Sequence, residues 1–213
     1  MSRGRAPKFQ LQRANILECA ADLFARNGFH NASMLELAKE CGVSKALLYH
    51  YYKDKEEILF DIADSYVDRL IEIIHDTKAQ KLDPEAYFTK LVCNYLLEYE
   101  HSESKHMVLV QDVKFLQSEM HLQVIGKQRM IVDEFSSAIT SMFPTITSGH
   151  LAKPLTMSLF GIINWTFTWL KPSGSLTFKE IAPLITNLFI HGVEGISSEI
   201  SLNKKIDKKV AND

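Results

Sequence analysis

Residues 45–50 place basic, small and aromatic side chains within two turns of a predicted helix. Lys45 can pair with a phosphate or with the edge of a guanine, and Ala46 leaves room to approach a thymine methyl. Tyr49 and His50 can donate hydrogen bonds to phosphate oxygens. This combination of side chains in one short segment indicates contact with double-stranded DNA.

The segments around these residues predict a helix-turn-helix. Apolar side chains recur at helical spacing up to Gly28, which favours the end of a helix there. Ser33 and Glu36 have the spacing of a capping box, and Ser44 can cap the helix that follows. Gly42 supplies the turn between these two helices. In such a motif the second helix places its N-terminal half in the major groove.

The predicted DNA-reading helix must have one side that faces the protein core and another that faces the DNA. We expect Leu47 and Leu48 to include the positions that face the core, and Tyr51 and Tyr52 to pack the small domain. Phosphates can also be reached from the start of the next helix and from the basic N-terminus. The candidates for DNA contact are Ser33, Ser44, Lys45, Ala46, Tyr49, His50, Lys55, Arg3 and Arg5.

Charge is distributed unevenly along the chain. The 213 residues carry 24 Lys and Arg against 26 Asp and Glu, a formal net charge of −2. Residues 1–55 hold nine basic and five acidic side chains, a net charge of +4, and the remainder holds 15 and 21, a net charge of −6. We therefore expect only the N-terminal part to meet a polyanion, and its affinity to depend on salt and on dimerisation.

Residues 9–62 resemble the N-terminal domain of the TetR family of transcriptional regulators. Residues 16–29 look like the first helix of that domain, residues 33–52 like its helix-turn-helix, and residues 53–59 like the opening of its fourth helix. The resemblance implies an all-α homodimer that binds a palindromic operator. It also implies a divergent C-terminal domain that binds a small molecule and releases the DNA, with repression as the default.

The rest of the chain predicts a helical body. Pro84 opens a helix to about residue 100, and further helices are expected at about 104–115, 119–142, 150–170 and 178–198, with no strand-like alternation. The expected fold class is all-α with about nine helices. Its expected parts are a three-helix DNA-binding domain over 1–55, a ligand-binding and dimerisation domain over 56–203, and a charged, disordered tail over 204–213.

An Asn and two Trp residues distinguish the apolar segment 161–172. The segment either contacts a ligand or packs the core or the dimer interface. It resembles a block in TetR-type regulators that respond to acyl-coenzyme A thioesters. That resemblance implies an apolar slot with cations for the phosphates. The candidate ligand residues are Asn164, Trp165, Phe167, Trp169 and Arg129, with Lys127 as a further candidate cation.

The family resemblance also implies where two copies of the chain meet. The last two long helices usually form the dimer interface in this family, and both are apolar enough here. Gly192 and Gly195 could let two helices approach closely, although Gly195 could instead fray the helix end. The candidate interface residues are Phe160, Leu188, Gly192 and Gly195.

Several classes of function are disfavoured. The sequence has no GxSxG, P-loop, HExxH or CxxC motif, and His101 and His106 are spaced so that they do not share one helix face. We therefore expect neither an enzyme nor a metal site nor a cofactor. The alternatives that stay open are a DNA-bound adaptor or activator of the same fold without a small-molecule signal, and a helical-bundle enzyme.

The three cysteines and the lack of targeting signals bear on the compartment. Cys19, Cys41 and Cys93 form an odd and sparse set, which suits a reducing compartment without a disulfide framework. No signal-peptide core is present, and the most apolar stretch is too short to span a bilayer. We expect a cytoplasmic protein that does not associate with membranes.

Overall fold

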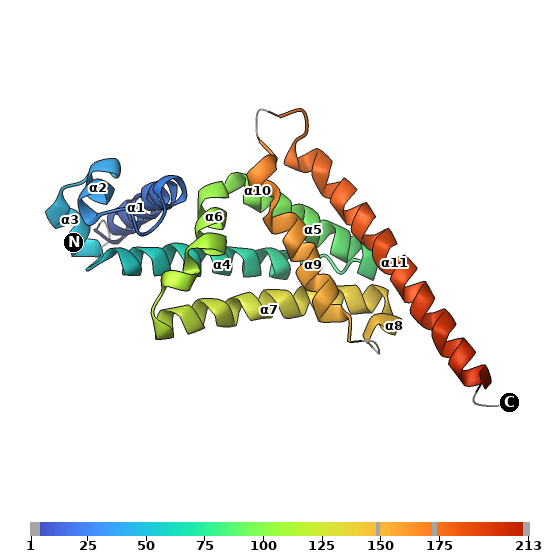
Figure 1. Ribbon diagram of the computed structural model, residues 1–213. Coiled ribbons are helices and arrows are strands. Elements are labelled where there is room, and N and C mark those ends of the chain that lie inside the picture. Colours follow the sequence, from blue (N-terminus) through green and yellow to red (C-terminus); the bar gives the residue numbers. More distant parts are fainter. Residues whose placement is uncertain (1–4, 148–149, 172–173, 211–213) are drawn as a thin grey trace. The chain divides into compact units, whose positions relative to one another are not determined.

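The computed structural model describes residues 5–147, 150–171 and 174–210, and all regular secondary structure in these ranges is helical (Figure 1). The expected all-α fold class is confirmed. The elements are α1 (Arg5–Asn27), α2 (Met34–Glu40), α3 (Lys45–Tyr51), α4 (Lys55–Lys78), α5 (Pro84–His101), α6 (Glu103–Gln111), the 3-10 helix η1 (Val113–Phe115), α7 (Ser118–Met142), α8 (Pro144–Thr147), α9 (Ala152–Asn164), α10 (Thr166–Trp169) and α11 (Phe178–Val210).

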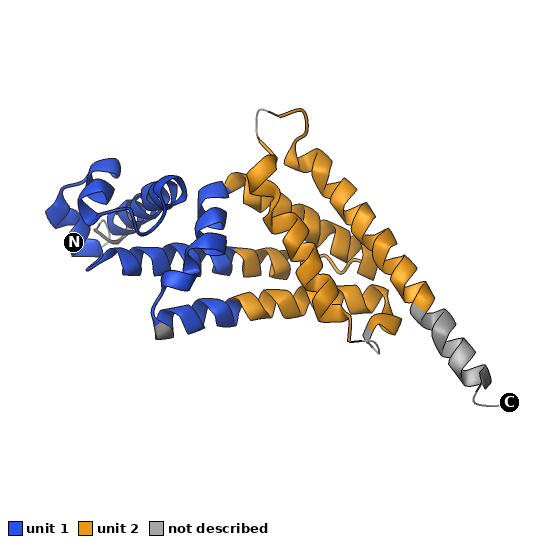
Figure 2. Cartoon of the chain, in the orientation of Figure 1, with its two compact units in different colours: residues 1–69, 102–127 blue, residues 70–101, 128–213 orange. Residues whose placement is uncertain are grey.

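The chain forms two compact units, each built from two stretches of sequence (Figure 2). Unit 1 comprises residues 1–69 and 102–127, and unit 2 comprises residues 70–101 and 128–213. Unit 1 extends well beyond the boundary expected at residue 55, because α6, η1 and the start of α7 pack with the N-terminal helices. Hydrophobic spacing within single helices could not show this long-range packing.

The core of unit 1 is built by apolar residues at helical spacing. Ile16, Phe24, Leu37, Leu48 and Ile58 are almost completely buried, and they come from four different helices. Burying a side chain of this size contributes about 1.5–3 kcal/mol each to folding. These residues therefore fix the position of α3 relative to α1, α2 and α4.

Two turns in unit 1 depend on glycine. Gly28 follows α1 with φ +79°, and its N–H donates to the carbonyl of Phe24 at 2.7 Å. Gly42 joins α2 to α3 with φ +64°. Side chains with a Cβ rarely adopt these dihedral angles, so both turns favour glycine. The predicted helix end and the predicted turn are confirmed.

An aromatic cluster forms the core of unit 2. The rings of Tyr95 and Phe135 have centroids 4.9 Å apart, and those of Phe135 and Phe160 are 5.0 Å apart. Phe88 of α5 stacks on Phe189 of α11 with centroids 5.6 Å apart. Edge-to-face and offset pairs of this kind add to the free energy gained by burial alone. The cluster joins α5, α7, α9 and α11.

The helix expected over residues 150–170 is divided in two. α9 ends at Asn164 and α10 begins at Thr166. The hydroxyl of Thr166 donates to the carbonyl of Ile163, and that of Thr168 donates to the carbonyl of Trp165, both at 2.7 Å. Hydroxyl side chains that bond to local carbonyls compete with regular helix hydrogen bonding.

The C-terminal helix is longer than the sequence predicts. α11 continues through Val210, where residues 204–213 were expected to be a disordered tail; residues 211–213 lie outside the described residues. No glycine or proline follows Gly195 in the sequence, and lysine and leucine favour helix. High charge alone therefore did not predict the end of this helix. Pro183 lies inside α11, beyond its first turn, so its missing N–H removes one intrahelical hydrogen bond.

Candidate DNA-binding surface and regulatory unit

Helix α3 separates into a buried and an exposed side. Leu48 is 0% exposed, whereas Lys45, Ala46, Tyr49 and His50 are exposed. The side chain of the preceding Ser44 caps the helix, because its Oγ accepts a hydrogen bond from the third helical N–H at 3.1 Å. Four predicted contact residues therefore lie on the solvent side of one short helix, within a single compact unit.

Leu47 of α3 is more exposed than the sequence predicts. It is 38% exposed, although we expected it to share the core-facing side with Leu48. Consecutive helical residues point about 100° apart, so two adjacent leucines cannot both face the core fully. That geometry is the signal that could have identified Leu47 as an apolar residue on the exposed side.

Lys45 and Tyr49 form a pair one helical turn apart. The Nζ of Lys45 lies 5.7 Å from the centroid of the Tyr49 ring, within cation–π range. Both side chains are exposed, and an ammonium and a phenol hydroxyl on one side of a helix suit phosphate oxygens. Tyr51 instead stacks on Phe9 of α1 with ring centroids 4.5 Å apart.

Ser33 forms the predicted capping box at the start of α2. Its Oγ accepts from the N–H of Glu36 at 3.2 Å, and its own N–H donates to the Glu36 carboxylate at 2.9 Å. The Ser33 hydroxyl also donates to that carboxylate at 2.8 Å. These hydrogen bonds lower the pKa of Glu36. The hydroxyl of Ser33 is thus engaged within its own helix.

Lys55 is turned toward the protein. Its Nζ lies 2.8 Å from the carbonyl oxygen of Phe29 and 3.0 Å from those of His30 and Ala32. It also lies 4.5 Å from the centroid of the Phe29 ring. An ammonium has three donor hydrogens, and these contacts use all three. The structure thus gives Lys55 a role in fixing the α1–α2 loop, and its contact with phosphate stays a prediction.

The basic N-terminus is only partly described. Arg3 lies outside the described residues, and Arg5 begins α1 with a side chain outside them. Further along α1, the guanidinium of Arg13 donates to Asp61 at 2.5 Å and to the hydroxyl of Tyr52 at 3.2 Å. Tyr52 is buried, as expected, so this group holds α1 against α4.

The Asn-Trp segment alternates between the inside and the outside of unit 2. The hydroxyl of Tyr99 donates to Oδ1 of Asn164 at 2.9 Å, and Phe167 is buried. Trp165 and Trp169 are 63% and 50% exposed. The structure therefore buries Phe167, half-buries Asn164 and leaves both indoles on the surface.

The two candidate cations also differ in their surroundings. Nζ of Lys127 in unit 1 lies 2.7 Å from Asp64 and 2.6 Å from Asp68. Arg129 is exposed, on unit 2. Lys127 is thus neutralised by two carboxylates, which leaves Arg129 as the better candidate for an anionic ligand group.

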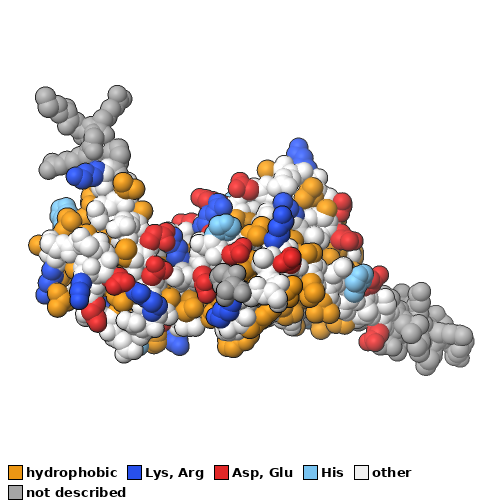
Figure 3. All heavy atoms as spheres, turned by 90° about the horizontal axis from the view of Figure 1, so that it is seen from above, with side chains coloured by type: hydrophobic (Ala, Val, Ile, Leu, Met, Phe, Trp, Pro, Cys, Tyr) orange, Lys and Arg blue, Asp and Glu red, His pale blue; other side chains and the backbone are white. Residues whose placement is uncertain are grey.

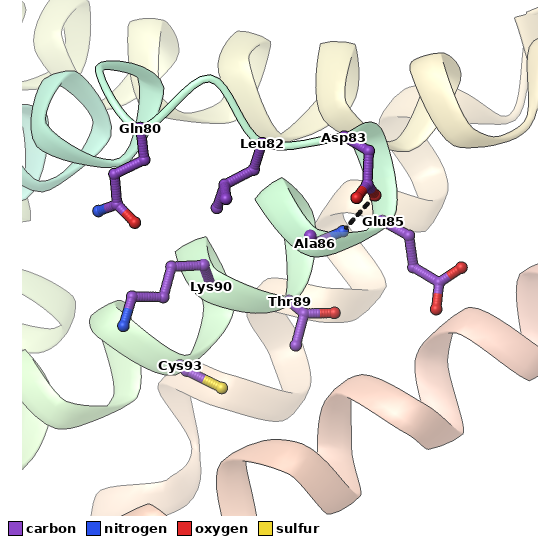
Figure 4. A pocket seen from close by; sticks show the side chains of 8 residues that line it. All are labelled: Gln80, Leu82, Asp83, Glu85, Ala86, Thr89, Lys90 and Cys93. Atoms are coloured by element: carbon purple, nitrogen blue, oxygen red, sulfur yellow. Dashed lines mark hydrogen bonds between the residues drawn. The ribbon is translucent and has the colours of Figure 1, made fainter.

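Two surface grooves lie beside α5 in unit 2. The larger, of about 790 Å³, is lined by the eight residues labelled in Figure 4, among them Lys90 and Cys93. The smaller, of about 410 Å³, contains Glu134, which accepts from Lys78 at 2.5 Å and from Tyr87 at 2.8 Å. None of the predicted ligand residues lines either groove.

Two family descriptions match the sequence. Residues 16–62 match bacterial regulatory proteins of the tetR family, and residues 81–193 match the tetracyclin repressor-like C-terminal domain. The chain belongs to the TetR family. It is a DNA-binding transcriptional regulator and not an enzyme, so the expected family, fold and class of function are confirmed.

Individual TetR-family proteins are similar along most of the chain. The fatty acid metabolism regulator protein of Bacillus subtilis (strain 168) is 22% identical over 198 residues, which cover 89% of this chain and 97% of that protein. A TetR-family regulator from Bordetella parapertussis 12822 is 33% identical with a TM-score of 0.80, over 83% of this chain and 93% of that chain. AibR in complex with isovaleryl coenzyme A and operator DNA is 24% identical with a TM-score of 0.72, over 83% and 97%.

The predicted dimer residues of this TetR-family chain fall into two groups. Phe160 is buried against Phe135, so it packs the core of its own unit. Leu188 is 65% exposed, and Gly192 and Gly195 have no neighbouring atoms where a Cβ would stand. Only the α11 residues therefore lie where a second copy could reach them.

The described part of the chain shows neither a cluster of metal ligands nor a membrane-spanning helix. No group of three His, Cys, Asp or Glu side chains there could hold a metal ion. Within the same residues, no helix is both long and apolar enough to cross a bilayer.

Proposed function

We propose that this TetR-family regulator is a repressor that binds a palindromic operator as a homodimer and is released by a hydrophobic acyl thioester. The observation that carries the DNA half of this proposal is the exposed side of α3, where Lys45, Tyr49 and His50 stand together around Ala46. Phosphate contacts from such residues supply affinity, and base-edge contacts supply specificity. Binding to chromosomal DNA also fits the expected location in the cytoplasm.

An apolar face on unit 2 supports the homodimer. Exposed apolar side chains follow one another at helical spacing on α9–α10 and again on α11, and hydrophobic atoms are visible on the surface of this unit in Figure 3. Exposed apolar side chains gathered on one unit favour an interaction site there. Its residues are Met157, Ile162, Trp165, Trp169, Leu184, Leu188 and Ile196.

Glycines on α11 fit the same interface. Gly192 and Gly195 lie between Leu188 and Ile196, and neither has a neighbour within 4 Å of an ideal Cβ position. Small residues let two helices approach closely. This supports assigning Trp165 and Trp169 to the dimer interface in preference to a ligand pocket.

The charge distribution explains why two copies are needed. One N-terminal segment with a net charge of +4 makes few phosphate contacts, and the rest of the chain is acidic. A dimer doubles the contacts and places two recognition helices one DNA turn apart, about 34–36 Å. The affinity should therefore fall steeply with salt, by a logarithmic slope of about −0.9 for each phosphate neutralised.

The nature of the effector is inferred from the relatives and from unit 2. One relative is a fatty acid metabolism regulator, and the structure of AibR holds isovaleryl coenzyme A. In this chain Asn164 and Tyr99 form a hydrogen-bonded pair, Phe167 is buried, and Arg129 offers an exposed cation. An apolar acyl chain, a polar thioester and an anionic coenzyme match these three features.

The proposal is tested by finding the operator and then the compound that releases it. DNA fragments selected by the pure protein are labelled, and their affinity is measured by fluorescence anisotropy at several salt concentrations. Tyr49→Phe should weaken binding by about 1 kcal/mol for each half-site through loss of one hydrogen bond. Tyr51→Phe on the same helix is the matched control and should bind as the unmodified protein does.

Effector specificity is tested on the same DNA complex. A series of acyl-coenzyme A thioesters is titrated against it, with coenzyme A alone and the free acids as controls. Nearly complete release requires the ligand to favour the released state by about 5.5 kcal/mol. Release by thioesters alone supports the proposal. Stable DNA binding with every compound would favour the adaptor or activator alternative.

A further inference from the structure

Two of the three cysteines meet inside unit 1. The Sγ of Cys41, at the end of α2, lies 3.8 Å from the carbonyl oxygen of Ile16 in α1. Cys19 follows Ile16 by three residues on α1, and its electrostatic interaction with Cys41 helps to raise the pKa of the Cys41 thiol, so the two thiols are neighbours. Cys41 is buried and Cys19 is half-buried. The pair is far apart in the sequence, so its proximity arises only from the packing of α1 on α2.

The packing around the pair allows a closer approach. Ala20 follows Cys19 in α1 and Ala38 lies in α2, and both are almost completely buried. Small side chains such as these let the backbones of two helices come near one another. A disulfide needs a sulfur–sulfur distance of about 2.05 Å, so the two neighbouring thiols must move closer together before they can bond.

We propose that Cys19 and Cys41 form a reversible disulfide by exchange with a small-molecule disulfide, and that this bond weakens operator binding. Formation of the disulfide concerns the thiols alone. The effect on operator binding rests on the proposed function. The site is thus a redox modification site within the DNA-binding unit, separate from any effector site in unit 2.

The exchange has a defined order. Burial and the neighbouring thiol raise the pKa of Cys41 to about 12, so its thiolate is scarce at neutral pH. The half-buried Cys19 therefore attacks first, as a thiolate, on a sulfur of the small disulfide, and one small thiolate leaves. Cys41 then loses its proton, attacks the Cys19 sulfur and displaces the second thiolate. Two protein thiols are oxidised, and one small disulfide is reduced to two thiols.

The bond would act on α3 through a short, hydrogen-bonded turn. Cys41 is the C-terminal cap of α2, and its N–H donates to the carbonyl of Leu37 at 2.9 Å. Val43, two residues on, donates to Ala38 at 2.9 Å, and Ser44 caps α3 immediately afterwards. Drawing Cys41 toward α1 therefore displaces the turn that positions the DNA-reading helix.

The first experiment measures the bond without DNA. The full-length Cys93→Ser variant, reduced and then treated with excess oxidised glutathione under native conditions, is digested without reduction and analysed by mass spectrometry. The expected product is one peptide pair joined through Cys19 and Cys41, with glutathione on Cys19 as an earlier species. A product that stays at the glutathione adduct, or no reaction, would overturn the proposal. Because no DNA is involved, failure of the operator proposal cannot produce this result.

The second experiment measures the consequence. Oxidation should lower operator affinity by about tenfold or more, the effect of losing a good base contact in each half-site, and dithiothreitol should restore it. Cys41→Ser should carry glutathione on Cys19, and Cys19→Ser should stay unmodified because Cys41 is buried. An oxidised protein with the Cys19–Cys41 bond and unchanged affinity would remove the switch while leaving the modification site. Circular dichroism of each variant confirms that it is folded.

Discussion

The ammonium of Lys55 holds the backbone carbonyl of Phe29 at a distance of 2.8 Å and lies 4.5 Å from the centroid of the same residue's ring. The first residue of α4 is thereby tied to the loop that follows α1. Because two further carbonyls of that loop accept from the same ammonium, Lys55 closes the loop much as a bound cation would. The position of α2 and α3 on α1 therefore depends on a residue outside both helices.

Replacing Lys55 by Met should affect stability more than the salt dependence of DNA binding. Hydrogen bonds from a charged donor contribute about 1.5–3 kcal/mol, so the free energy of unfolding should fall by about 2 kcal/mol. The slope of log affinity against log salt should stay unchanged if the ammonium remains on the loop carbonyls when DNA is bound. Urea unfolding and anisotropy titrations measure the two quantities.

Lys53→Met is the matched control for this change. Lys53 is exposed and pairs with Glu57 at 2.9 Å across one turn of helix, a contact that contributes about 0–1 kcal/mol. The control should therefore stay close to the unmodified stability. If Lys55→Met instead left stability intact and lowered the magnitude of the slope by about 0.9 per half-site, Lys55 would be a phosphate contact after all.

Leu47 and Leu48 are neighbours with opposite expected roles. Leu48→Ala removes a fully buried side chain and should lower the free energy of unfolding by about 2–5 kcal/mol. Leu47→Ala removes a side chain on the exposed side of α3, so stability should change by less than about 1 kcal/mol while operator affinity falls. Thermal unfolding and anisotropy on the selected operator separate the two. A large loss of stability in Leu47→Ala would show that Leu47 packs in the core.

The helix ends and the turn of the DNA-binding unit could be predicted from the sequence, because each depends on residues a few positions apart. These features are the capping box of Ser33 and Glu36, the cap at Ser44 and the glycine turn at Gly42. The exposed side of α3 follows from the same periodicity. The role of Lys55 in the α1–α2 loop could not be predicted in this way, because its carbonyl partners come from a loop more than twenty residues earlier.

The regulatory unit was less predictable for the same physical reason. Asn164, Trp165 and Trp169 are close in sequence, yet the break after α9 turns the first inward and the indoles outward. Periodicity assumed one continuous helix. Phe160 illustrates the same limit, since only tertiary packing against Phe135 shows that it belongs to the core.

A charge on α11 should separate the dimer. Leu188→Lys introduces an ammonium into the apolar face of unit 2, where burial against a partner would desolvate it. Sedimentation should show monomers, and operator affinity should fall because one DNA-binding unit makes half the contacts. Leu122→Lys is the control, because Leu122 is also 65% exposed but lies on α7 in unit 1. Dimers that persist in Leu188→Lys would exclude this face as the interface.

Asp112 provides a pH-dependent test of how η1 is attached to the same loop. Burial raises the pKa of its carboxyl, although the charges of Lys114 and His30 and the N–H of Phe29, which donates to the carboxylate, oppose that shift. A carboxyl with a raised pKa binds its proton more tightly in the folded than in the unfolded state. Stability therefore falls as pH rises from the ordinary carboxyl value to the raised one.

Asp112→Asn should keep an acceptor for the N–H of Phe29 without a buried charge. We expect it to match the unmodified protein at low pH and to be the more stable of the two near pH 7. Asp112→Ala should instead lose about 1–3 kcal/mol at every pH, because the N–H of Phe29 is left without its acceptor. Urea unfolding at pH 4 and pH 7 measures each difference. If Asp112→Asn became less stable than the unmodified protein as pH rose, the carboxylate would be favoured in the folded state, and its charge would contribute to the attachment of η1.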